Sequence, residues 1–167
     1  MKQSVLIIIK PDGMSRNLVG NVFTRFAGAG LEIVAIRIAK MTRKLAKEHY
    51  VNISGQPFFE DTVSYFCGKF HKVTNVMTIV YYGEGAIKKC RKIAGATNPN
   101  EAAASSLRGA YGRVSNSGIF ENVVHVSSDK KEAEREIKLW FTPDDIITKL
   151  YPTKTKTINA CKKRVWA

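Results

Sequence analysis

Three stretches that lie far apart in the sequence carry side chains suited to moving a phosphoryl group. A Lys-Pro-Asp-Gly motif at 10–13 ends an isoleucine-rich run and offers a fixed cation, and an Asn-Val-Val-His motif at 122–125 offers an imidazole. Neutral imidazole is nucleophilic near pH 7. Between these motifs, Arg91, Thr97 and Arg108 supply further groups that bind phosphate oxygens. Because the separate stretches agree on one chemistry, the sequence predicts a phosphoryl-transfer site.

Phosphates bound by this chain must be held by side chains, because the sequence has no P-loop motif and no dinucleotide-binding glycine motif after a strand. Of the three histidines, His125 is the candidate nucleophile. It ends a predicted strand just before a predicted helix N-terminus, where free N–H groups and the helix dipole favour anions. We interpret His49 and His71 as structural or solvent-facing residues.

The hydrophobic pattern predicts the elements that position these motifs. Residues 4–9 form an unbroken apolar run, typical of a strand buried on both faces. Further strands are predicted at 31–41, 73–82 and 122–126, and helices at 18–29, 42–50, 57–66, 86–93 and 129–140. Without the small helices the order is β-α-β-β-α-β, which predicts an α/β (α+β) fold with a ferredoxin-like antiparallel sheet. Residues 96–118 are expected to form a long loop before the last core strand.

The length of 167 residues fits one domain with a sizeable core. Cys67, Cys90 and Cys161 show no paired or metal-type spacing, so we expect free thiols in a reducing compartment. No apolar run is long enough for a membrane helix or for the core of a signal peptide. These features predict a cytoplasmic protein.

The net charge of +13 is the outlier of the composition. The last 19 residues hold six bases and no acid; without those six, the 27 bases fall to 21 against 14 acids, or +7. We therefore expect a folded domain over 1–148 and a basic C-terminal tail over 149–167. A basic surface attracts polyanions, but we interpret the tail as solvated lysines. Its bases are Lys149, Lys154, Lys156, Lys162, Lys163 and Arg164.

Several short motifs occur in a fixed order along the chain. They are Lys10-Pro11-Asp12-Gly13, Glu48-His49-Tyr50, Pro57-Phe58-Phe59, Gly95-Ala96-Thr97-Asn98-Pro99, Leu107-Arg108-Gly109 and Asn122-Val123-Val124-His125-Val126-Ser127, followed by Glu136-Ile137 and Leu139-Trp140-Phe141. Taken together, they make the chain resemble the nucleoside diphosphate kinase family. The resemblance runs from about Val5 to Phe141 and leaves only the tail outside.

The resemblance implies an enzyme with a ferredoxin-like core. It would transfer the γ-phosphate of a nucleoside triphosphate, usually ATP, to a nucleoside diphosphate through a phosphohistidine, by a ping-pong mechanism that maintains NTP and dNTP pools. Mg²⁺ would arrive with the nucleotide phosphates, so no protein residue is expected to ligate it. The expected partners are ATP, nucleoside diphosphates and further copies of the chain in a hexamer, with a tetramer or dimer as alternatives. No membrane partner is expected.

The resemblance also assigns roles to individual residues. His125 would be the nucleophile, Ser127 and Glu136 would support it, and Tyr50 would hydrogen-bond to Lys10. The residues implied to bind the nucleotide are Lys10 at the transferred phosphoryl and the 3′-hydroxyl, Asn122 at the 3′-hydroxyl, Phe58 under the base, and Arg91, Thr97 and Arg108 at the β- and γ-phosphates.

Two stretches depart from the family pattern. After the histidine the family usually has a small residue and then Ser-Asp, whereas this chain has Val126-Ser127-Ser128 and places Asp129 one position later. In the long loop, Ala104-Ser105-Ser106 replaces Pro-Gly-Thr, and residues 112–121 are longer by about four positions. These changes bear on the rate and on assembly more than on the type of reaction.

Two other functions remain open at this point. The strand order is shared with RNA-recognition motifs, and the positive charge fits a nucleic-acid-binding module, although the third strand lacks the expected aromatic motif. We hold nucleic-acid binding as a secondary activity of the basic surface. Alternatively, the changes at Val126, Ser128 and the loop would fit a catalytically weakened homologue. Because every residue with a direct chemical role is present, we favour activity.

Overall fold

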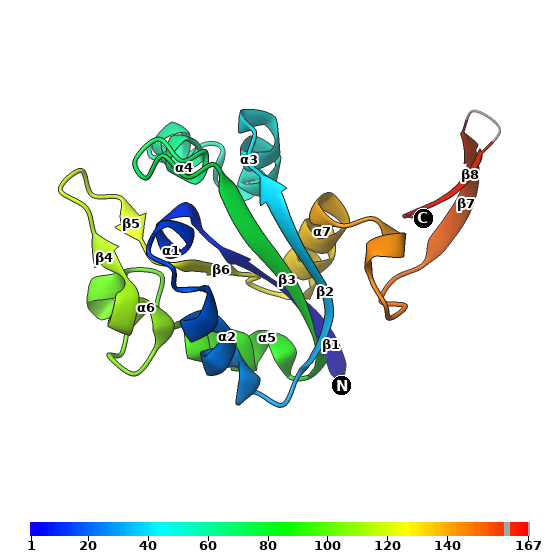
Figure 1. Cartoon of the computed structure of the whole chain (residues 1–167), viewed down its shortest axis with the longest axis horizontal. Coiled ribbons are helices and arrows are strands. Elements are labelled where there is room, and N and C mark those ends of the chain that lie inside the picture. Colours follow the sequence, from blue (N-terminus) through cyan, green and yellow to red (C-terminus); the bar gives the residue numbers. More distant parts are fainter. Residues whose placement is uncertain (159–160, 167) are drawn as a thin grey trace.

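A four-stranded antiparallel sheet forms the centre of the molecule (Figure 1). The computed structural model describes residues 1–158 and 161–166. The sheet order is β2-β3-β1-β6, and every neighbouring pair is antiparallel. With the connecting helices this is the predicted ferredoxin-like arrangement. The elements of the motif are β1 (Lys2–Ile9), α2 (Val19–Ala27), β2 (Glu32–Lys40), β3 (Asn75–Glu84), α5 (Ala86–Ala94) and β6 (Val124–Val126).

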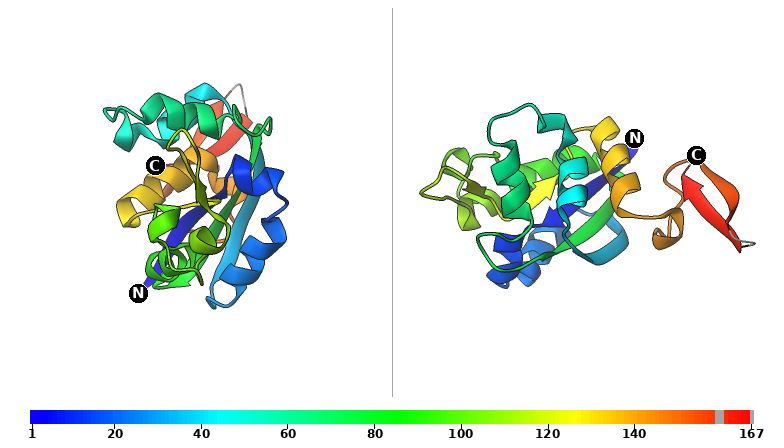
Figure 2. Two further views of the ribbon diagram at one scale, coloured as in Figure 1. Left: turned by 90° about the vertical axis from the view of Figure 1, so that its left-hand side faces the viewer. Right: turned by 90° about the horizontal axis from the view of Figure 1, so that it is seen from above.

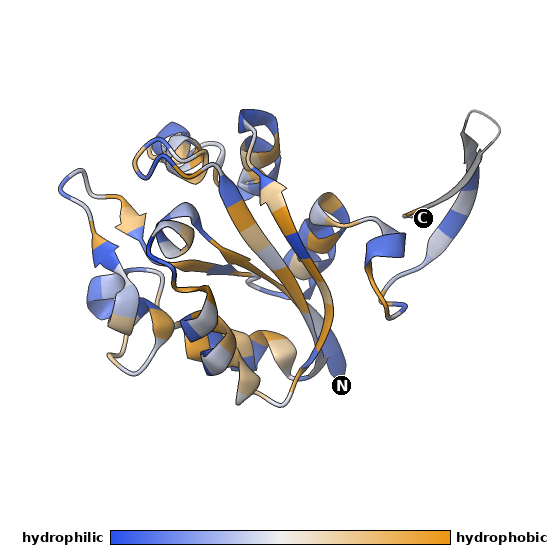
Figure 3. Cartoon of the chain, viewed as in Figure 1, coloured by the Kyte–Doolittle hydropathy of each residue, from blue (hydrophilic) through white to orange (hydrophobic). Residues whose placement is uncertain are grey.

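Strand β1 is buried on both faces, as its unbroken apolar run predicts. Its alternating side chains enter two separate cores: Val5, Ile7 and Ile9 pack with α2 and α5, and Leu6 and Ile8 pack on the opposite face. The second core is completed by α3 (Arg43–His49), α4 (Phe59–Phe66) and α7 (Lys130–Trp140). Hydrophobic residues therefore line the central strands (Figure 3).

Strand β2 contains a register shift between Ile33 and Ala35. The extra residue of such a bulge changes which side chains face the core. Val34 and Ala35 are both buried, whereas Ile36 and Ile38 are 50% and 60% exposed. Strand β2 is an edge of the sheet, so its outer side pairs with no other strand of the described residues. The carbonyl of Val34 accepts a hydrogen bond from the N–H of Ile147 at 3.1 Å.

Two segments for which no helix or strand was predicted are ordered. The residues after Lys10 form a short helix, α1 (Pro11–Ser15), in which Pro11 occupies the first helical position, where a missing N–H is harmless. The expected long loop contains η2 (Pro99–Glu101), α6 (Leu107–Tyr111) and a two-stranded ribbon of β4 (Arg113–Val114) and β5 (Phe120–Glu121). A 3-10 turn, η1 (Val51–Ile53), separates α3 from α4.

The C-terminal segment continues through η3 (Pro143–Asp145) into a hairpin of β7 (Thr153–Ile158) and β8 (Cys161–Trp166). The hairpin stands away from the sheet and its helices (Figures 1 and 2). This part of the expected basic tail is thus a regular element. Among the described side chains, those of Cys67 and Cys90 are free thiols. The structure describes the backbone of Cys161 but not its side chain. The described helices include none long and apolar enough to cross a membrane.

Candidate active site

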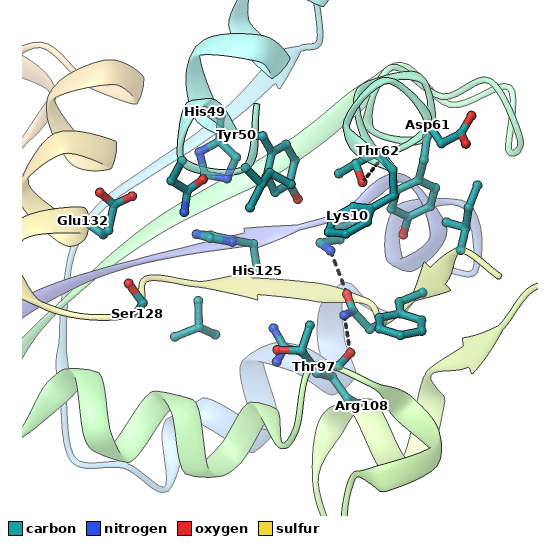
Figure 4. Close-up of a pocket in the computed structure, with 18 of the residues that line it drawn as sticks. Lys10, His49, Tyr50, Asp61, Thr62, Thr97, Arg108, His125, Ser128 and Glu132 are labelled. Atoms are coloured by element: carbon teal, nitrogen blue, oxygen red, sulfur yellow. Dashed lines mark hydrogen bonds between the residues drawn. The ribbon is translucent and has the colours of Figure 1, made fainter. Parts of the chain in front are cut away.

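A cavity of about 540 Å³ opens at the end of the sheet where β1 and β6 meet the helices and the β4–β5 ribbon (Figure 4). It gathers nearly all residues that the sequence assigned to a site, although they are widely spaced along the chain. The predicted residues that line it are Lys10, Tyr50, Phe58, Arg91, Thr97, Arg108, Asn122, His125 and Glu136. Ser127 is buried behind the wall and contacts Glu136.

His125 lies on β6 with its side chain 18% exposed. Its Nε2 is 2.8 Å from Glu136 Oε1, and Ser127 Oγ donates to Glu136 Oε2 at 2.6 Å. Ser127 Oγ in turn accepts a hydrogen bond from the backbone N–H of Leu6. This chain of bonds fixes the imidazole to the central strand. Because a carboxylate is the partner of Nε2, the proton of a neutral ring stays on that nitrogen, and the lone pair remains on Nδ1.

Lys10 leaves the end of β1 and is buried at the cavity wall. Its Nζ donates to Asn122 Oδ1 at 2.7 Å, and Asn122 Nδ2 donates to the carbonyl of Thr97 at 2.7 Å. Burial lowers the pKa of Lys10 to about 7, with a further contribution from the positive charge of Arg108. The neutral amine form of Lys10 is therefore poised to gain a proton when an anion enters, which makes it an ammonium.

Arg108 is held by two backbone carbonyls. Its Nη1 donates to Gly95 at 2.9 Å and its Nη2 to Val124 at 3.0 Å, while its buried Nε has no partner among the described residues. Burial lowers its pKa to about 10, and the nearby charge of Arg91 adds to this effect. Gly95 is suited to its position because its φ is +87° and because a Cβ there would lie only 2.2 Å from Ser106 Oγ.

Asp12, which sequence reasoning did not select, fixes the backbone next to the predicted nucleophile. Its Oδ2 accepts from the backbone N–H of Val123 at 2.9 Å, and its Oδ1 accepts from Tyr65 Oη at 2.5 Å. Val123 has φ of 66°, a left-handed conformation that costs a β-branched residue about 1–3 kcal/mol. The N–H of Lys10 also donates to the carbonyl of Val123 at 2.8 Å. The carboxylate therefore stabilises a strained turn that joins Lys10, Asn122 and His125.

His49, interpreted from the sequence as structural, packs against the predicted nucleophile. The rings of His49 and His125 are 4.5 Å apart at 80°. Trp140 Nε1 donates to His49 Nδ1 at 3.2 Å, so the proton of the neutral ring lies on Nε2, which has no partner among the described residues. Burial and the charge of His125 lower the pKa of His49. His49 is thus a neutral ring at the edge of the site.

The three side chains of His49, His125 and Glu136 place one ligand atom each within 4.8 Å of one another. They do not fit a resident metal ion. Binding through His49 Nε2 would displace its proton to Nδ1, where Trp140 already donates. Mg²⁺ also prefers oxygen ligands, and Glu136 already has two hydrogen-bond partners.

Tyr50 does not make the expected hydrogen bond to Lys10. The hydroxyl of Tyr50 is buried and has no partner among the described residues, while Lys10 Nζ bonds to Asn122 instead. Burial raises the pKa of Tyr50, and the negative charge of Glu136 adds to the rise. Tyr50 therefore stays a neutral hydroxyl that lines the cavity.

Two aromatic side chains stand at the mouth of the cavity. Phe58, at the start of α4, is 52% exposed, and Phe120, on β5, is 37% exposed. Both line the cavity, together with Ile119 of the β4–β5 ribbon. Sequence reasoning selected Phe58 as a binding residue but missed Phe120. The feature that could have identified Phe120 is its position as an aromatic residue in the segment that is longer than in the family. Glu121 anchors this ribbon, because it pairs with Arg113 and lies 3.3 Å from His71.

Asp129, which lies one position later than the aspartate of the family pattern, has a structural role. Asp129 caps α7 by accepting from the N–H of Glu132 at 3.0 Å, and it also accepts from Ser128 Oγ at 2.8 Å. Ser128 and Glu132 line the cavity. Val126, bulkier than the usual residue at its position, lines it as well but is buried. Val126 and Ser128, two of the departures from the family pattern, thus lie in the wall of the cavity.

Comparison with known proteins gives a consistent result. The sequence profile described as "Nucleoside diphosphate kinase" matches residues 3–146. The nucleoside diphosphate kinase of Pyrococcus furiosus is 40% identical over 144 residues, covering 86% of each chain. That of Methanocaldococcus jannaschii is 35% identical over 149 residues, covering 89% of this chain and all of the relative.

Solved structures that resemble this chain belong to the same family as its sequence relatives. The nucleoside diphosphate kinase of Aquifex aeolicus superimposes with a TM-score of 0.78 at 31% identity, covering 88% of this chain and all of that one. A transition-state mimic of the Borrelia burgdorferi enzyme with bound vanadate and ADP also has a TM-score of 0.78 at 31% identity, covering 89% and 92% of the two chains. On this fold, this cavity and these relatives, the chain belongs to the nucleoside diphosphate kinase family.

Proposed function

We propose that His125 is the nucleophile of a ping-pong transfer of the γ-phosphate from a nucleoside triphosphate to a nucleoside diphosphate. The observation that carries this proposal is the 2.8 Å contact between His125 Nε2 and Glu136 Oε1, which leaves the lone pair on Nδ1. Nδ1 attacks the γ-phosphorus, the bond to the bridging oxygen breaks, and the nucleoside diphosphate leaves. A terminal oxygen of the second diphosphate then attacks the phosphorus, and the P–N bond breaks.

The cationic wall of the cavity would stabilise the charge that develops during transfer. Phosphoryl transfer depends on positioning and on spread positive charge more than on covalent chemistry. Arg108 is preorganised by its two carbonyl partners, and Lys10 is held by Asn122. We assign the β- and γ-phosphates to Arg91, Arg108 and the hydroxyl of Thr97, all of which line the cavity.

The remaining contacts would recognise the nucleoside. Stacking on Phe58 accepts any base, because every base presents a π-face, and this supports broad base tolerance. Asn122 and Lys10 lie on the same side of the cavity and would bind the sugar 3′-hydroxyl. Ser127 and Glu136 support the histidine, and Tyr50 contributes a neutral hydroxyl near Lys10.

Mg²⁺ would enter with the nucleotide rather than wait in a protein cage. The only three-ligand cluster among the described residues contains two histidines, which suit Mg²⁺ poorly. Bound to the phosphates, the ion would neutralise part of their charge. The protein side chains supply the rest of the positive charge and the alignment with His125.

We infer an active enzyme rather than a weakened homologue. The residues with direct chemical roles lie in one cavity with their supporting hydrogen bonds formed. The altered residues Val126 and Ser128 lie in its wall, where they would change the rate but supply no reacting atom.

We also propose that the chain assembles as a homo-oligomer, with a hexamer as the first expectation. The exposed edge of β2, with Ile36 and Ile38, supports self-association, because an unpaired apolar edge is a ready template for another copy.

We further propose a catalytic domain over 1–148, followed by the basic C-terminal segment over 149–167. A cytoplasmic location is supported by the free thiols of Cys67 and Cys90.

Initial-rate kinetics test the proposed reaction. With ATP as donor and GDP as acceptor, rates measured at several fixed GDP concentrations should give parallel double-reciprocal lines, because the first product leaves before the acceptor binds. Intersecting lines would show a ternary complex and contradict the phosphohistidine. His125→Gln serves as the background control.

A further inference from the structure

The β7–β8 hairpin is fixed to the body at its base. Trp166 Nε1 donates to the carbonyls of Phe141 at 3.0 Å and Lys138 at 3.2 Å. The rings of Trp166 and Tyr151 are 5.8 Å apart, and Lys138 Nζ lies 5.7 Å and 5.5 Å from their respective centroids. An isolated two-stranded hairpin is only marginally stable in water. This anchor therefore stabilises the hairpin and fixes its direction away from the body (Figure 2).

Basic positions occur on both faces of the hairpin. Lys154 and Lys156 are exposed on β7 and share one face of the strand. The strand register places Lys163 opposite Lys156, which adds a basic position to the same face. It places Lys162 and Arg164 opposite Thr157 and Thr155, which belong to the other face.

This charge is not compensated nearby. The sequence holds no acidic residue after Asp145, and neither Lys154 nor Lys156 has an ion-pair partner among the described residues. The family profile ends at residue 146. The hairpin is thus an addition to the kinase fold. Its charge has no role in the proposed transfer, since no described residue beyond Glu136 lines the cavity.

We propose that the β7–β8 hairpin binds duplex DNA by entering the major groove and contacting phosphates on both sides. The major groove of B-form DNA admits a two-stranded β-ribbon. Six residues per strand give a ribbon about 20 Å long, and bases on both faces match a groove bordered by two phosphate backbones. Such contacts would be independent of sequence and sensitive to salt.

Other polyanions fit this element less well. Single-stranded nucleic acid is usually bound by exposed aromatic side chains that stack on the bases, but Trp166 and Tyr151 are partly buried and pack on each other. Duplex RNA has a deep, narrow major groove that excludes a ribbon. The favoured ligand is therefore duplex DNA.

The test is fluorescence anisotropy of a labelled 20-base-pair DNA duplex, titrated with the intact chain from 50 to 200 mM KCl. The test variant is Lys154→Gln with Lys156→Gln. A matched control, Lys88→Gln with Lys92→Gln, removes the same charge from exposed positions on α5. The hairpin variant should bind at least about tenfold more weakly at 100 mM KCl and lose about 1.8 from the slope of log K against log salt, since each phosphate contact contributes about 0.9. Its phosphotransfer rate should equal that of the intact chain.

Several outcomes would overturn the proposal. Equal losses in the hairpin variant and the α5 control would assign binding to overall charge. Equal or tighter binding to a single strand or to an RNA duplex of the same sequence would exclude groove entry, as would hairpin-dependent binding to phosphatidylserine vesicles without duplex binding. No duplex binding at 50 mM KCl would also end it. Because phosphotransfer is measured separately, none of these results bears on the proposed catalytic function.

Discussion

In the proposed transfer, one carboxylate selects the nitrogen of His125 that reacts. Glu136 occupies Nε2 of the imidazole, and Ser127 occupies the other oxygen of Glu136. The carboxylate also stabilises the imidazole as its charge changes during transfer. The proposed reactivity therefore depends on buried hydrogen bonds that form before the substrate arrives, and those of Lys10 and Asp12 are the simplest to test.

The pH dependence of the reaction should reflect Lys10, whose pKa is lowered to about 7. Because phosphate contact needs the ammonium, kcat/KM for ATP should fall about fivefold between pH 7 and pH 8 as the charge is lost. The unfolded chain binds this proton more tightly, so Lys10 contributes increasing stability from pH 7 to about 10.5. The loss of activity should therefore not accompany unfolding. A flat kcat/KM profile from pH 6 to 9 would contradict this account, and Lys10→Arg should lose the break, since arginine stays charged.

Asp12→Ala should destabilise the fold by about 1–3 kcal/mol, because it leaves the buried N–H of the strained Val123 without its acceptor. It should also lower kcat, since that turn carries Asn122 and His125. Asp12→Asn keeps an acceptor oxygen and should recover most of the loss. Tyr65→Phe, which removes only the other hydrogen bond, should cost about 0.5–1.5 kcal/mol. Urea unfolding measures all three variants; an Asp12→Ala chain as stable as the intact one would refute the role of the carboxylate.

At the scale of elements, the sequence pattern predicted those strands, helices and caps that depend on local interactions. The apolar run of β1, the helix spacing of α2 and the capping residue Asp129 of α7 all have the predicted structure. The bulge in β2 was not predictable, because it depends on pairing with β3. Segment 96–118 was expected to be a loop since its small residues have weak preferences; its order depends on contacts such as Arg113 with Glu121.

The β4–β5 ribbon should contribute to nucleotide binding through Phe120, which lines the same cavity as Phe58. Phe58→Ala should raise KM for ATP by about 5- to 150-fold, as the loss of 1–3 kcal/mol of stacking implies. Phe120→Ala should raise KM by a smaller factor while kcat changes little. Phe70→Ala is the control, because Phe70 is 44% exposed but does not line the cavity. Steady-state kinetics in which Phe120→Ala behaves as Phe70→Ala would exclude the ribbon from the site.

For the whole molecule, the motifs predicted residues that the fold brings into one cavity, but not how these residues support one another. Spacing alone could not show that Lys10 bonds to Asn122 instead of Tyr50, or that His49 touches His125, because these contacts join positions far apart in the sequence. The C-terminal hairpin was likewise missed, since alternating threonine and lysine residues indicate no core of their own. Its order depends on Trp166 reaching the body.

Assembly of the whole molecule should depend on the exposed edge of β2. Ile38→Glu places a charge on that apolar edge and should lower the mass measured by size-exclusion chromatography with light scattering. Val51→Glu provides the control, because Val51 is 51% exposed and lies in η1, outside the sheet. If Ile38→Glu retained the mass of the intact chain, the edge of β2 would not be the interface.

The most direct test of the central claim is the phosphoenzyme. The intact chain, incubated with γ-labelled ATP and Mg²⁺ and no acceptor, should take up label in an acid-labile, base-stable form, as expected for phosphohistidine. Addition of GDP should move that label to GTP. His125→Ala should fold normally, as judged by circular dichroism, and take up no label. A labelled His125→Ala chain, or an intact chain that binds ATP but never becomes labelled, would contradict the account.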